Sequence, residues 1–358
     1  MSALDPVIEI AGRRIGSGYP YVIAEMSANH AHDLSRACAI VRAAKDAGAD
    51  AIKLQTYTPD TMTIDSPAAP FVIQGTPWHG RRLYELYGDA HTPWEWHEPL
   101  RREAEKVGLH FFSTPFDTTA VDFLERLGVP AYKIASFELV DIPLLRRVGR
   151  TGKPVILSTG MGTLDEIAEG VSVLRSGGCD ALALLKCTSA YPAAPDEMHL
   201  ATIADMRSRF GVPVGVSDHT MDIAVPVSAV ACGACIVEKH LTISRSEPGP
   251  DSAFSLEPDE FKAMVDAVRA AARALGSVHY GPTAREEGSL VFRRSLFVVR
   301  DVARGEAFTA DNVRCIRPGF GLHSRHLEEV IGCRAACDIP AGSPLGWAHV
   351  DRSVAHAG

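Results

Sequence analysis

Eight short apolar runs alternate with eight amphipathic helical patterns along most of this 358-residue chain. The runs at 214–220 and 235–240 are rich in valine and isoleucine, as is typical of strands buried on both faces of a parallel sheet. Eight strand–helix units in about 260 residues match the number and size of the units in a (β/α)8 TIM barrel. A doubly wound sheet is the alternative, but no G-x-G-x-x-G turn follows the first run. The predicted strands lie at about 21–25, 50–55, 109–113, 131–135, 154–158, 181–186, 213–217 and 235–240. The predicted helices lie at about 34–47, 94–107, 118–127, 142–150, 164–176, 197–210, 222–232 and 258–275.

Three segments depart from this repeat. Residues 7–18 alternate in polarity around turn glycines and predict a hairpin at the start of a barrel domain spanning 1–283. The long connection at 57–93 has five prolines and several aromatic residues, so we expect a lid or binding loop at the carboxyl face of the barrel. After a polar linker at 284–294, short strands and turns predict a separate small β-rich domain at 295–351.

Composition excludes several classes of protein. The net charge of −8 and the pI near 6.0 argue against binding to nucleic acid or to an acidic membrane surface. No apolar run approaches the roughly 20 residues that span a membrane, and the first residues lack a signal-peptide pattern. The eight cysteines are scattered and are expected to be reduced thiols. We therefore expect a cytoplasmic protein with neither a nucleic-acid nor a membrane partner.

Two of the apolar runs end in a histidine. V-G-V-S-D-H-T at 214–220 ends near His219, and C-I-V-E-K-H at 235–240 ends at His240. A helix separates the two runs, so the strands are predicted to be parallel neighbours with both imidazoles at the same end of the sheet. Such a pair is half of a site for a divalent metal ion. The alternative is that both rings are ordinary core histidines.

Lysines follow the same strand ends. A lysine within an apolar strand is costly to bury unless its ammonium meets an anion. There are four such lysines, and we expect at least two to bind a phosphate or a carboxylate: Lys53, Lys133, Lys186 and Lys239. The alternative is that one or two form structural ion pairs with Glu25, Glu138 or Glu238.

The turn Ser158-Thr159-Gly160-Met161-Gly162 precedes a helix and also suits a phosphate. Lysines and hydroxyls for a small phosphorylated acid thus lie near two metal-type histidines and several carboxylates. A metal ion beside a carbonyl polarises it as a Lewis acid. This combination favours carbon–carbon bond formation between a phosphorylated enol and an aldehyde.

Several motifs resemble the sialic acid synthase family, and the resemblance covers nearly the whole chain, including a C-terminal antifreeze-like (SAF) domain. Within that family, S-A-N-H, L-Q-T-Y-T-P-D-T and T-P-W-E-W-H are similar to the pseudaminic acid synthase branch. The motifs that carry the family resemblance are A-E-M-S-A-N-H (24–30), A-G-A-D-A-I-K-L-Q-T-Y-T-P-D-T (47–61), S-T-P-F-D (113–117), Y-K-I-A-S-F-E (132–138), S-T-G-M (158–161), Y-P (191–192), S-D-H-T (217–220), E-K-H (238–240) and R-P-G-F-G (317–321).

The resemblance implies a metal-dependent condensation of phosphoenolpyruvate with an N-acetylated amino sugar, 2,4-diacetamido-2,4,6-trideoxy-L-altrose, to give pseudaminic acid and phosphate. It implies that His219 and His240 hold Mn2+ or Mg2+, with Gln55 nearby through water. It implies that Glu25 contacts the sugar and that Glu138 helps to activate the attacking water. The other implied sugar contacts are Tyr191, Asp251 and Arg317. The implied phosphoenolpyruvate contacts are Lys53, Thr114, Lys133, Ser136, Ser158, Ser189 and Ser217.

The resemblance further implies a domain-swapped homodimer, in which the SAF domain of one subunit brings Arg317 to the active site of the other. Three alternatives remain open at this stage. The same reaction could use N-acetylmannosamine or the legionaminic precursor. A metal-dependent hydrolase is disfavoured because the first strand ends in Ala24-Glu25 and carries no His-x-His pair. A non-catalytic sugar-binding barrel would not need the strand-end lysines and both histidines.

Overall fold

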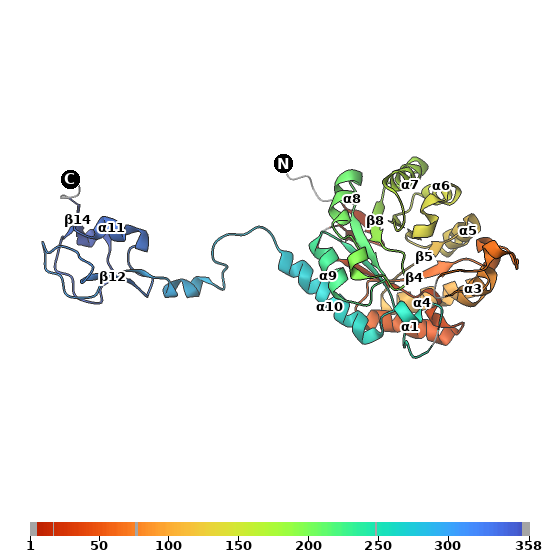
Figure 1. Cartoon of the computed structure of the whole chain (residues 1–358), viewed down its shortest axis with the longest axis horizontal. Helices are drawn as coiled ribbons and strands as arrows, with labels where there is room; N and C mark the ends of the chain where they lie inside the picture. Colours follow the sequence, from red (N-terminus) through yellow and green to blue (C-terminus); the bar gives the residue numbers. More distant parts are fainter. Residues whose placement is uncertain (1–5, 17, 76–77, 248, 353–358) are drawn as a thin grey trace. The chain divides into compact units, whose positions relative to one another are not determined.

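Eight parallel strands close into a barrel in the computed structural model, and helices surround them (Figure 1). The structure describes residues 6–16, 18–75, 78–247 and 249–352. Each strand pairs with the next along the chain, and β10 closes the ring by pairing with β3. The predicted TIM barrel is confirmed. The barrel strands are β3 (Tyr21–Glu25), β4 (Ala51–Thr56), β5 (His110–Pro115), β6 (Tyr132–Ile134), β7 (Val155–Ser158), β8 (Leu182–Cys187), β9 (Val214–Asp218) and β10 (Ile236–His240).

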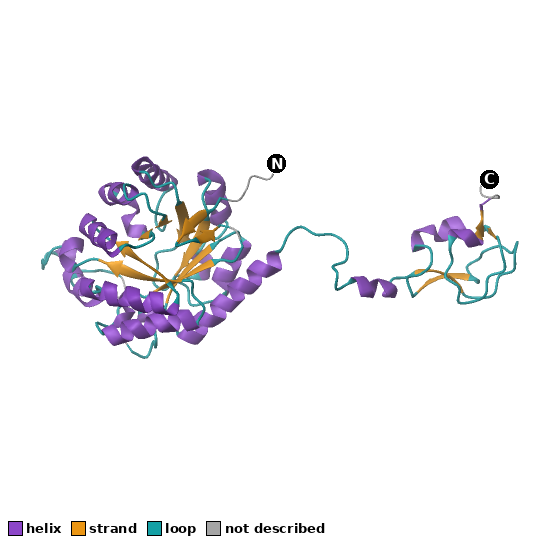
Figure 2. Ribbon diagram, turned by 180° about the vertical axis from the view of Figure 1, so that it is seen from behind, coloured by secondary structure: helices purple, strands orange, loops and turns teal. Residues whose placement is uncertain are grey.

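Local signals in the sequence set the ends of the outer helices. The Asp33 carboxylate accepts hydrogen bonds from the backbone N–H groups of Ser35 and Arg36 and so caps the first helix. Gly108 ends the helix His97–Val107 (α4) in the left-handed conformation that glycine adopts without strain. Figure 2 shows these helices outside the strands. The outer helices are α1 (Leu34–Asp46), α4 (His97–Val107), α5 (Thr118–Leu127), α6 (Ile142–Gly149), α7 (Leu164–Gly177), α8 (Thr202–Phe210), α9 (Ala224–Ala231) and α10 (Pro258–Leu275).

The predicted N-terminal hairpin is present. Strand β1 (Ile8–Ile10) pairs antiparallel with β2 (Arg13–Ile15). Its isoleucines are buried in the same hydrophobic core as the barrel strands. The Asp50 carboxylate accepts a hydrogen bond from the Val22 N–H and pairs with the Arg13 guanidinium, which ties the hairpin to the barrel.

The long connection at 57–93, which was predicted to be a lid or binding loop, contains short helices. Helix α2 (Pro59–Met62) and helix α3 (Leu83–Ala90) lie within it, together with a 3₁₀ turn at Ala69–Phe71. The sequence did not predict these short helices, because prolines and glycines are frequent in this segment. The two helices pack against each other, which gives this segment a defined shape at the carboxyl ends of the strands.

A second unit begins after Gly276, at residue 277. It has a small core of its own, which includes Leu296 and Phe308. Within the predicted linker at 284–294, residues Glu287–Phe292 form a short 3₁₀ helix. No helix in the described part of the chain has both the length and the apolar character needed to cross a membrane. The elements of the second unit are β11 (Ser295–Val298), β12 (Val313–Ile316), α11 (Leu327–Val330), β13 (Arg334–Ala335) and β14 (Val350–Asp351).

Candidate active site

The polar strand-end residues meet at one mouth of the barrel because all eight strands run in the same direction. His240 of β10 lies in register with Glu25 of β3, and Glu25 lies in register with Lys53 of β4. Side chains alternate between the two faces of a strand. The side chains of Glu238 and His240 therefore lie on one face of β10, and that of Lys239 lies on the other.

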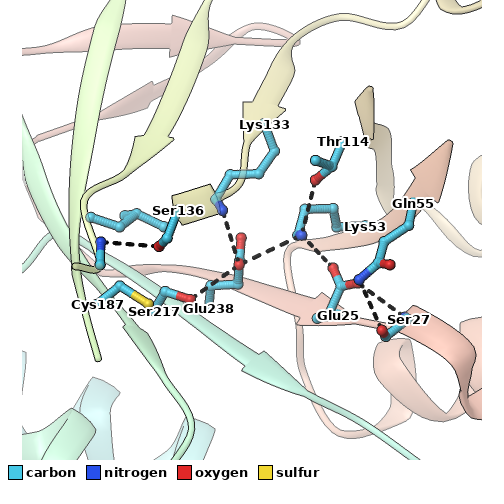
Figure 3. Close-up of polar contacts among 12 residues, drawn as sticks. Glu25, Ser27, Lys53, Gln55, Thr114, Lys133, Ser136, Cys187, Ser217 and Glu238 are labelled. Atoms are coloured by element: carbon cyan, nitrogen blue, oxygen red, sulfur yellow. Dashed lines mark hydrogen bonds and ion pairs between the residues drawn. The ribbon is translucent and has the colours of Figure 1, made fainter. Parts of the chain in front are cut away.

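Two lysines and two glutamates form a buried charge network at the centre of this mouth (Figure 3). The Lys53 Nζ lies 2.6 Å from Glu25 Oε2 and 3.6 Å from Glu238 Oε1. The Lys133 Nζ lies 3.3 Å from the same Glu238 oxygen. Glu238 thus lies between the two ammonium groups, and all four side chains are almost fully buried. Lys53 also donates a hydrogen bond of 3.2 Å to Thr114 Oγ1.

The protonation states follow from burial and from these partners. Burial alone would lower the pKa of Lys53, but the carboxylates of Glu238 and Glu25 outweigh it and raise this pKa above its usual value. Burial would raise the pKa of Glu238, but the two ammonium groups hold it below its usual value. Burial lowers the pKa of Lys133, which Glu238 only partly offsets. The network keeps Lys53 and Glu238 charged in the interior of the barrel.

Hydroxyl groups surround the lysines. Ser217 donates a hydrogen bond of 3.3 Å to Glu238 Oε1, and Ser136 Oγ accepts one of 3.0 Å from the Gly160 N–H. A Cβ atom at position 160 would lie 2.4 Å from Ser189 Oγ and 2.7 Å from Ser136 Oγ, so only glycine fits between these serines. The buried Ser158 Oγ has no hydrogen-bond partner among the described residues. Because buried polar atoms are normally hydrogen bonded, this hydroxyl indicates room for a polar ligand.

The two predicted metal-type histidines are neighbours at the same mouth. Their ring centroids are 5.4 Å apart. The His219 Nδ1–H donates to the Thr188 carbonyl at 2.9 Å, which leaves Nε2 of the neutral ring with a free lone pair. The buried His240 Nδ1 has no hydrogen-bond partner among the described residues, and burial holds the pKa of this ring far below its usual value.

These donors fit a divalent cation held by two imidazoles, with its other positions open to water or substrate. No group of three or more histidine, cysteine, aspartate or glutamate side chains within the described ranges has metal-binding geometry.

The other two strand-end lysines contact residues outside this network. Lys239 donates to the Asp218 carboxylate and to the Thr220 carbonyl, the residues on either side of His219. This buried contact ties the end of β10 to the loop that carries His219. Lys186 donates to the carbonyl of Cys187 at 2.8 Å. Of the four lysines, Lys53 and Lys133 are the pair at the centre of the mouth.

Next to Glu25, a chain of hydrogen bonds connects further predicted residues. The Gln55 Nε2 donates to Glu25 Oε1 at 3.1 Å and to Ser27 Oγ at 2.8 Å. Ser27 in turn donates to the Asp251 carboxylate. The Tyr191 ring lies against the His219 ring, with a centroid distance of 4.5 Å.

Glu138 stands apart from this chain. Its Oε2 is buried and has no hydrogen-bond partner in the part of the chain that the structure describes. Burial raises the pKa of Glu138 to about 7, and the positive charge of Lys133 offsets only part of this effect. A carboxyl group with such a pKa is suited to exchanging a proton near neutral pH.

A cavity of about 340 Å³ opens beside these groups, and Gln55, Glu138, Tyr191, His240 and Asp251 are among its lining residues. The volume lies within the range of small-molecule sites. The predicted barrel residues are thus brought together at one mouth. Arg317 belongs to the second unit, so its contact with a sugar stays a prediction.

Two residues of the mouth were not assigned to the site from the sequence. Glu238 was named only as a possible structural ion-pair partner of the strand-end lysines, and it does pair with both Lys53 and Lys133. Its place at the mouth could have been predicted, because it precedes His240 by two residues and so shares its face of β10. Ser27, which joins Gln55 to Asp251, was given no role. Ser27 lies in a 3₁₀ turn after β3, where no periodicity marks it.

Comparison with known proteins supports a single family. The model of the NeuB family matches residues 40–280, and the model of the SAF domain matches residues 293–351. The chain belongs to the NeuB family. The resemblance of its motifs to the sialic acid synthases is thereby confirmed, as is the predicted SAF domain.

Relatives within the NeuB family include two proteins named pseudaminic acid synthase. The one from Helicobacter pylori is 43% identical over 337 residues, which cover 94% of this chain and 99% of that protein. The one from Campylobacter jejuni serotype O:23/36 is 45% identical over 325 residues, covering 91% and 95%. The crystal structure of the N-acetylneuraminic acid synthetase from Leptospira borgpetersenii, in complex with citrate, is 30% identical with a TM-score of 0.72. It covers 81% of this chain and 97% of that one.

Proposed function

We propose that this NeuB-family chain is a pseudaminic acid synthase, a transferase that joins phosphoenolpyruvate to 2,4-diacetamido-2,4,6-trideoxy-L-altrose and releases phosphate. The observation that carries the proposal is the meeting of the Lys53–Glu238–Lys133 network with the His219–His240 pair at one barrel mouth. An anion site beside a metal-type pair is what a condensation between an enol phosphate and an aldehyde requires. The identities of 43% and 45% to pseudaminic acid synthases support the choice of sugar.

Phosphoenolpyruvate would bind over the two central lysines. Lys53 and Lys133 supply positive charge to its phosphate and carboxylate, and the hydroxyls around them complete its hydrogen bonds. The unpartnered Ser158 Oγ supplies a donor at the same place, and the backbone N–H of Gly160 orients the Ser136 hydroxyl by donating to it. The hydroxyl contacts are Thr114, Ser136, Ser158, Ser189 and Ser217.

His219 and His240 would hold the divalent cation, Mn2+ or Mg2+, with Gln55 nearby through water. Bound there, the cation would polarise the sugar aldehyde as a Lewis acid. Glu25, Tyr191 and Asp251 would orient the sugar so that its aldehyde carbon faces C3 of the enol. Glu25 lies in register with His240, the Tyr191 ring lies against the His219 ring, and Asp251 lines the same cavity as His240.

The reaction then proceeds in two stages. C3 of phosphoenolpyruvate attacks the aldehyde carbon, and positive charge develops at C2. Water adds to C2, and the resulting adduct loses phosphate with cleavage of the C2–O bond. Glu138 would take the proton from that water, and the buried carboxylates stabilise the charge at C2 in a site that excludes solvent.

Activity should therefore depend on the protonation of Glu138. A pKa of about 7 means that the carboxylate form is lost as the pH falls through 7, so kcat/KM should fall roughly tenfold per pH unit below that value. Glu138→Gln should lower kcat by about 10²- to 10⁴-fold and remove this acidic limb. The measurement is a pH profile of phosphate release for both proteins. An unchanged acidic limb in Glu138→Gln would contradict the role of Glu138 as the base.

We also propose that the active form is a domain-swapped homodimer, in which the second unit of one subunit brings Arg317 to the sugar in the other. The motif R-P-G-F-G at 317–321, shared with the family, supports this. Arg317→Ala should raise the KM for the sugar by about 10-fold or more, because a charge-assisted hydrogen bond is lost, and leave the KM for phosphoenolpyruvate nearly unchanged. Arg314→Ala is the matched control, since Arg314 is exposed on β12, three residues before Arg317.

A mixing experiment distinguishes between the swapped dimer and a monomer as the active form. A heterodimer of Arg317→Ala and His219→Ala subunits contains one site with an intact barrel and an intact arginine. At a sugar concentration well below its KM, the two variants that are unfolded, mixed and refolded together should therefore be clearly more active than the average of the two separate variants. No recovery, or equal effects of Arg317→Ala on both KM values, would contradict the swapped arrangement.

An isotope experiment tests the proposed chemistry. Phosphoenolpyruvate labelled with 18O in the bridging C2–O–P position should deliver the label to phosphate, because the C2–O bond breaks. Label that remains in the sugar acid would show P–O cleavage and contradict the mechanism. Phosphate release without any sugar would instead favour a hydrolase.

A further inference from the structure

The side chains that line the cavity beside the site fall into two groups. One group is polar and is assigned above to the metal, the sugar and the base; it includes Gln55, Glu138 and His240. The other group is largely apolar and comes mainly from the segment 57–93. We call six of its side chains the apolar wall: Met62, Ile73, Leu83, Leu86, Tyr87 and Phe116.

The apolar wall has a fixed shape. Leu86 is buried, and the Tyr57 ring lies against Tyr87 on one side and Phe116 on the other, with centroid distances of 5.7 and 5.1 Å. At the start of α3, the Arg82 guanidinium holds Asp65 and Glu85 at 2.5 Å each. The segment therefore presents a preformed surface to the cavity.

The wall offers little to a polar substituent. Of its six side chains, only Tyr87 carries an oxygen or nitrogen atom. Tyr57 and Trp78 of the same segment also line the cavity, and the Trp78 indole N–H already donates to the Pro250 carbonyl. A methyl group placed there replaces water on an apolar surface, which is favourable. A hydroxyl group placed there loses hydrogen bonds to water and finds few partners.

We propose that the apolar wall is the subsite for the C6 methyl group of a 6-deoxy amino sugar, and that it selects against sugars with a hydroxyl at C6. The inference rests on the proposed function. It adds which side chains of this chain recognise the substituent at C6 of the sugar. This wall does not discriminate between sugars that share the C6 methyl group but differ in stereochemistry. The polar side chains of the cavity must make that distinction.

The test uses two sugars that differ at one atom: 2,4-diacetamido-2,4,6-trideoxy-L-altrose and its counterpart with a hydroxyl at C6. The wild-type protein should prefer the 6-deoxy sugar by about a hundredfold in kcat/KM, the discrimination typical of an apolar pocket against an added hydroxyl. Met62→Gln and Leu83→Asn should reduce this ratio by about tenfold or more, because each adds an amide of similar size. The KM for phosphoenolpyruvate should not change.

Ile64→Gln is the matched control. Ile64 lies in the same segment but is 60% exposed and does not line the cavity. It should leave the sugar ratio as in the wild type. Thermal unfolding midpoints of all variants check that the changes act in the cavity and not through folding.

The outcomes distinguish two failures. If the wild type turns over neither sugar, the proposed function fails and the inference falls with it. If the wild type turns over the 6-deoxy sugar without discriminating, or if both wall variants keep the wild-type ratio, only the inference is overturned.

Discussion

Replacing either His219 or His240 with alanine should abolish phosphate release, with a loss of at least about a thousandfold. The two rings lie 5.4 Å apart between centroids, and each has a nitrogen free to bind a cation. A cation that polarises a carbonyl supplies several kcal/mol of transition-state stabilisation, and a single remaining imidazole holds it poorly. The readouts are phosphate release and, independently of activity, the affinity for Mn2+ measured by electron paramagnetic resonance.

His279→Ala is the control for this prediction, because His279 is exposed and lies in the second unit. It should bind Mn2+ and turn over as the wild type does. Near-normal activity or unchanged Mn2+ affinity in either His219→Ala or His240→Ala would contradict the metal assignment.

Lys53→Met should produce the second large loss. The ammonium lies between Glu25 and Glu238, and its removal leaves two buried carboxylates without this partner. Breaking a buried pair in this way typically costs about 3–5 kcal/mol of stability. The substrate anion also loses a charge-assisted hydrogen bond, so the KM for phosphoenolpyruvate should rise by about 10- to 100-fold in the folded fraction.

Stability and binding are separated by measuring both. Thermal unfolding reports the first effect, and initial rates against phosphoenolpyruvate concentration report the second. Lys262→Met removes an exposed ammonium that pairs with Asp266 on α10, and it should change neither quantity noticeably. A folded Lys53→Met variant with a KM within twofold of the wild type would show that Lys53 does not bind the substrate.

The barrel was predictable because its signals are local and repeated. Each buried strand is centred on a short run of mainly apolar residues, and caps such as Asp33 mark where helices begin. The parallel direction of the strands then placed His219, His240, Lys53 and Lys133 at one mouth without knowledge of any distance. This reasoning is general to barrels of this type.

The pairing within the mouth could not be predicted in the same way. Lys239, like Lys53, is a lysine within an apolar strand. Its side chain lies on the other face of β10 from Glu238 and His240, and there it pairs with Asp218. Helices α2 and α3 were missed because they are short and interrupted by proline and glycine, and because tertiary packing rather than propensity stabilises them.

The most direct test of the proposed function is phosphate release from phosphoenolpyruvate with Mn2+ and each of three sugars, with an EDTA control. The sugars are 2,4-diacetamido-2,4,6-trideoxy-L-altrose, N-acetylmannosamine and the legionaminic precursor. The proposal predicts rapid release with the altrose derivative alone and none with EDTA. Release with N-acetylmannosamine or the legionaminic precursor in preference to it would contradict the assignment of the sugar, and no release with any of the three would contradict the enzyme assignment itself.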